Sequence, residues 1–267
     1  ALATAATVTT LDVRSNSIGE NGGLALARLA AECDSLAELN VSDNLLFRPP
    51  SAADGEAARP SLAPAALAEA LGASKGLRRL SWRCTATSLP RMSSRARCAW
   101  LAALVRMFQS RRKLSELTLA AQPLVARAEA PEEMAEPILS IATDMGVALA
   151  RQWELRALDL SATALDDAPL GALIPPLRAH PALTVLNLSG NVLGLDACAA
   201  LGSLFSAASP LTRLELRSAA IDARGLKRLL AHLGFNQRLS HLDLSRNPLG
   251  TRAAPVVVAA GEEPAAV

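Results

Sequence analysis

One frame, L-x-x-L-x-L-x-x-N-x-L, recurs in LTVLNLSGNVL (Leu183–Leu193), LTRLELRSAAI (Leu211–Ile221) and LSHLDLSRNPL (Leu239–Leu249). These three copies start 28 residues apart. Extending the frame toward the N-terminus gives five more copies, which start at Val8, Leu36, Leu77, Leu114 and Leu155. Self-similarity at a fixed period indicates a repeat architecture, so the sequence predicts an array of stacked units.

Each copy predicts a short strand followed by a helix. In the fourth copy Leu117 and Leu119 alternate with Thr118, as in a strand that buries one face and exposes the other. Apolar residues then recur at three- and four-residue spacing, as Leu226 and Leu229 do, which is typical of an amphipathic helix. We expect the ninth position to bond backbone groups of neighbouring units where it holds Asn16, Asn44, Asn191 or Asn247. The other four copies carry Thr85, Gln122, Thr163 and Ala219 at this position.

From Val8 to Gly250 this pattern resembles the leucine-rich-repeat family, and its 28-residue period resembles the ribonuclease-inhibitor-like subclass. The resemblance implies an α/β, right-handed solenoid (a horseshoe) with parallel strands on the concave face and helices on the convex face. Because each coil buries its apolar face only against its neighbours, we expect residues 1–267 to form a single domain of about eight repeats with its core at 8–250. The chain lacks an initial Met, so we interpret it as part of a longer polypeptide.

Composition narrows the functional class. The net charge of +2 is too near zero to indicate a nucleic-acid or membrane-surface protein. No apolar run reaches the roughly 18–20 residues that a membrane span needs. The four cysteines are scattered without a C-x-x-C pair, which fits a reducing, cytoplasmic compartment.

Outward-facing strand positions form a polar column on the expected concave face. It reads Asp12, Asn40, Ser81, Thr118, Asp159, Asn187, Glu215 and Asp243. The column could bind another protein, or it could be generic repeat sequence that keeps the face soluble. Glu215 and Asp243 are neighbours at one strand spacing of about 4.8 Å, yet a solvated acidic face is favoured over a catalytic or metal site. We therefore expect no catalytic residue, no metal and no cofactor.

Three consecutive repeats are longer than 28 residues. Their surplus of 13, 9 and 13 residues falls between strand and helix, in RPPSAADGEAARPSLAP, SLPRMSSRARC and ARAEAPEEMAEP. These Pro-rich polar segments predict loops, and strand-to-helix loops of a solenoid emerge on one rim. They are either tolerated insertions or a docking platform. The second segment is basic and the third is acidic.

These observations favour a non-catalytic protein–protein interaction scaffold that binds one or more proteins. It would be a subunit or module of a larger intracellular assembly, such as a cytoskeletal or ciliary one, with no nucleic acid, membrane or small-molecule substrate as partner. The alternative is a regulator of a small GTPase resembling the Ran GTPase-activating proteins, although that family carries a strongly acidic tail that this chain lacks. The predicted partner-binding residues are Arg91, Arg95, Arg97, Glu132, Glu133, Asp159, Glu215 and Asp243.

Overall fold

The computed structural model describes residues 7–47, 61–84, 94–110, 113–121 and 135–250; for 94–97 and 135–138 it describes the backbone alone. Its strands form one sheet in which every neighbouring pair is parallel and follows the order of the sequence. The strands are β1 (Thr10–Asp12), β2 (Glu38–Asn40), β3 (Arg79–Ser81), β4 (Glu116–Thr118), β5 (Ala157–Asp159), β6 (Val185–Asn187), β7 (Arg213–Glu215) and β8 (His241–Asp243). We number the coils 1–8 by the strand that each contains.

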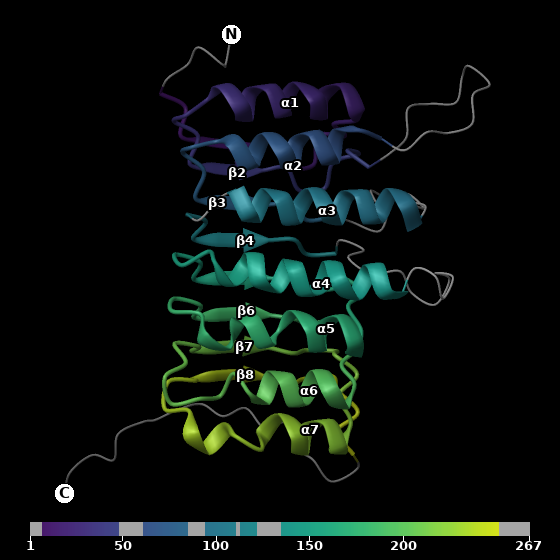
Figure 1. Cartoon of the computed structure of the whole chain (residues 1–267), viewed down its shortest axis with the longest axis vertical. Helices are drawn as coiled ribbons and strands as arrows, with labels where there is room; N and C mark the ends of the chain where they lie inside the picture. The colour runs from purple at the N-terminus through teal and green to yellow at the C-terminus, as the bar shows by residue number, and fades with distance from the viewer. Residues whose placement is uncertain (1–6, 48–60, 85–93, 111–112, 122–134, 251–267) are drawn as a thin grey trace, which may run out of the picture.

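Helices connect successive strands, as parallel pairing requires. They are α1 (Glu20–Glu32), α2 (Ala63–Ala73), α3 (Ser94–Ser110), α4 (Ala135–Ala150), α5 (Asp167–Leu173), α6 (Leu195–Gly202) and α7 (Ala223–Leu230), with the 3-10 helices η2 (Pro175–Ala179) and η3 (Leu233–Phe235). Each helix packs on the next, and together they cover one face of the sheet (Figure 1). The expected solenoid of inner strands and outer helices is confirmed.

The register of the sheet follows the repeat frame. The second strand residue of each coil pairs with its equivalent in the next, as Leu158 does with Leu186 and Leu186 with Leu214. All three of these leucines are at most 1% exposed. The third repeat, which matches the frame least well, pairs in the same register through Leu80.

Part of the surplus sequence in the long repeats is helical. Residues 94–98 of the expected second loop begin α3, and residues 135–137 of the expected third loop begin α4. The prediction of loops over these residues was wrong because Ala, Arg and Glu favour helices, and Pro137 fits the first turn, where its missing N–H has no helical partner. Coils 3 and 4 therefore carry helices of 17 and 16 residues and coil 2 one of 11, whereas α5, α6 and α7 have 7 or 8. In the first expected loop, residues 63 and 64 begin α2 and residues 61 and 62 precede it. The remainder of the three segments lies outside the described residues.

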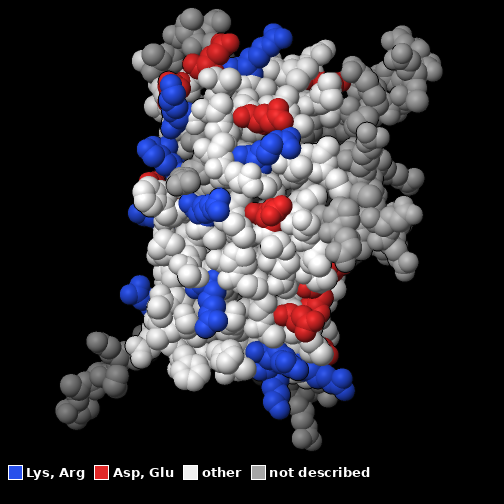
Figure 2. All heavy atoms as spheres, in the orientation of Figure 1, with Lys and Arg blue, Asp and Glu red and all other residues white. Residues whose placement is uncertain are grey.

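Leucine and alanine fill most of the core, but coils 2 and 3 contain an aromatic cluster. Trp82 lies with its ring 4.7 Å from that of Trp100 and 6.1 Å from that of Phe47, centroid to centroid. Trp82 is 1% exposed, as the frame predicts for a residue at a leucine position. Charged side chains lie on the outside of the helix layer and along its edges (Figure 2).

Candidate protein-binding surface

The uncovered side of the sheet, which we call the strand face, carries the first and third residues of each strand. The third residues stand side by side in the predicted column, because each pairs with its equivalent in the next coil. Glu215 and Asp243 are direct neighbours, whereas Asn187 separates Asp159 from Glu215. The structure thus brings together two of the three predicted carboxylates on this face. All three are partly buried.

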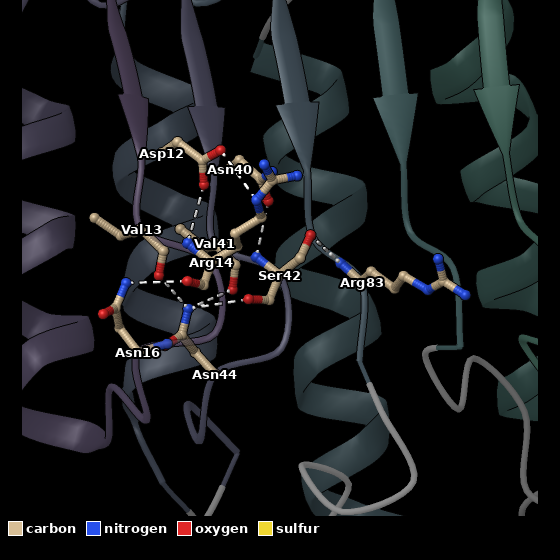
Figure 3. Close-up of polar contacts among 9 residues, drawn as sticks. All are labelled: Asp12, Val13, Arg14, Asn16, Asn40, Val41, Ser42, Asn44 and Arg83. Carbon is tan, nitrogen blue, oxygen red and sulfur yellow. Dashed lines mark hydrogen bonds and ion pairs between the residues drawn. The ribbon is translucent and has the colours of Figure 1, made fainter.

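Asp and Asn side chains in this column also stabilise the turns that follow the strands, a role that we did not predict from the sequence. In five coils the Oδ1 atom accepts a hydrogen bond from the backbone N–H two residues further on, at 2.8–3.1 Å. The bond fixes the chain where the strand ends, as an Asx turn does. The acceptors are Asp12, Asn40, Asp159, Asn187 and Asp243, of which the first two are drawn in Figure 3. The repeated Asp or Asn at this position was the signal for it.

The two neighbouring carboxylates do not form an acid–base pair. Oε1 of Glu215 lies 2.6 Å from Nε of Arg213, on the same strand. Burial alone would raise the pKa of Asp243, but hydrogen bonding from Ser245 and the nearby charges of Arg217 and His241 outweigh it and lower that pKa below its usual range. The lowered pKa keeps Asp243 ionised at neutral pH, so this carboxylate is not poised to donate a proton as a general acid.

Asparagine at the ninth position ties neighbouring coils together, as predicted. Oδ1 of Asn44 accepts the backbone N–H groups of Asn16 and Ile18 at 3.1 and 3.0 Å, in the preceding coil. Its Nδ2 donates to the carbonyl of Val13 at 2.8 Å and to that of Val41 in its own coil (Figure 3). The same pattern recurs at two other junctions, through Asn191 and Asn247.

These asparagine bridges alternate along the second half of the array. They join coil 5 to coil 6 and coil 7 to coil 8. Between coils 6 and 7 the equivalent position is Ala219, and its backbone carbonyl accepts the N–H of Leu193 instead. In the coils whose N–H groups bond to the Asn of the next coil, the residues on both sides of the ninth position have left-handed backbone conformations, as Ala162 and Ala164 do in coil 5. The junctions are thus of two kinds.

The strand face is hollowed beside β1–β4, and the hollow has a volume of about 250 Å³. Arg79 lies in it, paired with Glu38 and 4.0 Å from Glu116. Within the described residues no three His, Cys, Asp or Glu side chains come close enough to hold a metal ion. The helices that the structure describes are all too short or too polar to cross a membrane.

The residues predicted on the long-loop rim fall largely beyond what the structure describes. Arg91, Glu132 and Glu133 lie outside the described residues. Arg95 and Arg97 are in α3, not in a loop, and their side chains are not described. The binding of a partner by this rim remains a prediction.

His180 is a buried polar group whose role the sequence did not indicate. It is 3% exposed, and its Nδ1 accepts the backbone N–H groups of Ala182 and Leu183 at 3.2 and 3.0 Å. Its Nε2 lies 2.9 Å from the carbonyl oxygen of Gln152, so the neutral ring donates there. Burial lowers the pKa of His180, more than the bond to Gln152 raises it. The equivalent residue of coil 8, Asn236, accepts the same two N–H groups of its own turn through Oδ1.

We expect the free energy of unfolding of the unmodified protein to decrease, relative to that of the His180→Asn variant, as the pH is lowered from 7.5 to 5.5. Because the folded pKa is depressed, the contribution of neutral His180 is full above its unfolded pKa of about 6.5 and is lost as the pH falls toward the folded pKa. Asn supplies the acceptor without titrating. Denaturant unfolding at three pH values measures the difference, whose slope is at most about 1.4 kcal/mol per pH unit. A difference independent of pH would contradict the assignment.

A family profile described as "Leucine Rich repeat" matches residues 4–27 and 179–202. The fold is that of a leucine-rich-repeat solenoid. Tonsoku-like protein from Bos taurus is 41% identical over 90 residues, which are 33% of this chain and 7% of that protein. Leucine-rich repeat-containing protein 73 from Homo sapiens is 33% identical over 111 residues, 40% of this chain and 35% of that protein. The chain therefore aligns with only a minor part of each relative's length.

Proposed function

We propose that this chain is a non-catalytic module that binds a protein partner on its strand face, within a larger intracellular assembly. The proposal rests on the column of polar side chains, which lie in register on the uncovered side of the sheet. The hydrogen bonds of the Asx turns fix the backbone where the strands end. Such a surface is preorganised, so little conformational entropy is lost when a partner binds. The lowered pKa of Asp243 and the pairing of Glu215 with Arg213 support binding over acid–base chemistry.

Within the strand face, we propose that coils 5–7 contact the partner. The first strand position holds the small or apolar Ala157 and Val185 in coils 5 and 6, and Arg213, paired with Glu215, in coil 7. Beyond them lies the exposed Arg217, which forms no ion pair in the described part of the chain. A weakly hydrated centre beside charged groups resembles the core and rim of protein interfaces. We also propose that the rim with the long segments, including Arg91, Arg95 and Arg97, extends this surface.

Proximity labelling with mass spectrometry tests the proposal. A strand-face variant, Ala157→Glu with Val185→Glu, should lose a defined set of labelled proteins because it adds bulk and charge to the contact. A helix-face variant, Arg224→Glu with Lys227→Glu on α7, is the matched control and should keep that set. If both variants label the same proteins as the unmodified chain while remaining folded, the strand face is not the binding surface. An unchanged rate of Ran–GTP hydrolysis is expected on adding the chain.

A further inference from the structure

A basic strip lies on the edge of the solenoid where each helix leads into the next strand. It consists of the turns that lead from each helix into the next strand in coils 3–6, residues 74–78, 113–115, 151–156 and 180–184, together with η2. These turns lie along the left edge in Figure 1, and basic side chains follow the same edge in Figure 2. Its described charged residues are Lys75, Arg78, Lys113, Arg151, Arg156 and Arg178, with Glu154 as the acid among them.

Two of these cations already have partners. Nζ of Lys75 lies 3.1 Å from Oδ2 of Asp34, and the guanidinium of Arg78 donates to the carbonyls of its own turn. The other four are exposed and make no ion pair within the described residues: Lys113, Arg151, Arg156 and Arg178. Neither an ion pair nor burial therefore explains why basic residues occupy these four positions.

Trp153 lies between Arg151 and Arg156 in the same turn and is 59% exposed. The other two tryptophans of the chain, Trp82 and Trp100, are 1% and 2% exposed. A large ring left in water loses the stabilisation that burial would give, and binding energy at interfaces is concentrated on such tryptophans when a partner covers them.

The turn that presents Trp153 is held from beneath. Gln152 is fully buried, and its Nε2 donates to the carbonyl of Phe108 at 2.6 Å. The carbonyl of Gln152 accepts from Nε2 of His180 at 2.9 Å and from the N–H of Leu155 at 2.8 Å. This network ties the turn to the preceding coil through Phe108 and to the next coil through His180. Trp153 is thus placed on a rigid support, which reduces the entropy lost on binding.

We propose that this basic strip is a docking site for an acidic, extended peptide segment of a protein partner. Carboxylates of the segment pair with the four uncommitted cations, and an apolar or proline side chain packs on the ring of Trp153. These four cations lie in coils 4–6, and two coil steps of about 4.8 Å span roughly 10 Å, the length of about three extended residues. Glu154 can accept the backbone N–H groups of a peptide, which a sugar–phosphate backbone lacks, and this favours protein over nucleic acid. The site is independent of the strand face.

Selection from a displayed library of random twelve-residue peptides, on the full chain, tests this proposal. The enriched peptides should be acidic and should contain proline or aliphatic residues. Neutral or basic enriched peptides would overturn it, as would an empty selection. The best peptide, labelled with a fluorophore, then reports affinity by anisotropy.

Trp153→Ala should weaken binding of that peptide at least about 10-fold, and Arg151→Gln with Arg156→Gln should both weaken it and flatten its salt dependence. Phe235→Ala is the matched control, because Phe235 is 66% exposed but lies in η3, outside the basic strip. It should leave the affinity unchanged, and all variants should keep the melting temperature. Equal affinity of Trp153→Ala and the unmodified chain would refute the site. Tighter binding of single-stranded DNA or phosphatidylserine vesicles, with the same dependence on Trp153, would also refute it.

Discussion

Asn191→Ala should lower the free energy of unfolding by about 3–4 kcal/mol. The side chain is 2% exposed, and its Oδ1 accepts the N–H groups of Thr163 and Leu165 while its Nδ2 donates to the carbonyls of Leu160 and Leu188. Alanine would remove the partner of both N–H groups and of the Leu188 carbonyl, whereas the carbonyl of Leu160 keeps the hydroxyl of Thr163. Each unpaired buried group costs about 1–3 kcal/mol when water cannot reach it. Chemical denaturation followed by circular dichroism measures the loss.

Asn16→Ala is the control at the equivalent position of coil 1. Asn16 is exposed, and its side chain makes one described hydrogen bond, from Nδ2 to the carbonyl of Arg14. We expect a loss below about 1 kcal/mol for this variant. Comparable losses at the two positions would mean that the bridges between coils do not stabilise the array.

Trp82→Ala should destabilise the protein by about 3–5 kcal/mol. The ring is buried against Trp100 and Phe47, so truncation creates a cavity between the sheet and α3. Trp82→Leu should recover part of the loss, because other coils place leucine at this position, as Leu119 and Leu160 show. Thermal melting measures the three proteins side by side.

Trp153→Ala controls for the loss of an aromatic ring. Its side chain is 59% exposed, and substitutions at such surface positions change stability by about 0.5 kcal/mol or less. Acrylamide should correspondingly quench the fluorescence of Trp153 and leave that of the buried pair. If Trp153→Ala lost as much stability as Trp82→Ala, the assignment of Trp82 to the core and Trp153 to the surface would be wrong.

The strands were predictable from sequence because the alternation of leucines imposes both burial and register on each coil. The bridging asparagines were predictable for the same reason, since their position in the frame is fixed. The start of α3 was not predictable, because Ser94–Cys98 is polar enough for a loop and becomes helical where Leu101 and Leu104 of the same helix are buried in the core. The basic strip was missed because its cations are far apart in sequence, and stacking of the coils brings them to one edge.

Junctions with and without an asparagine bridge alternate in coils 5–8, and this alternation determines how many coils can be gained or lost at a time. Loss of coil 6 alone would place coil 5 against coil 7, where Ala219 offers no side-chain acceptor for the N–H groups of Thr163 and Leu165. Loss of residues 183–238 would instead join coil 5 to coil 8, and Asn247 would accept both. Within coils 5–8, recombination that removes or adds 56 residues therefore preserves the asparagine bridges, whereas a step of 28 does not. Natural length variants of this segment should differ by pairs of coils.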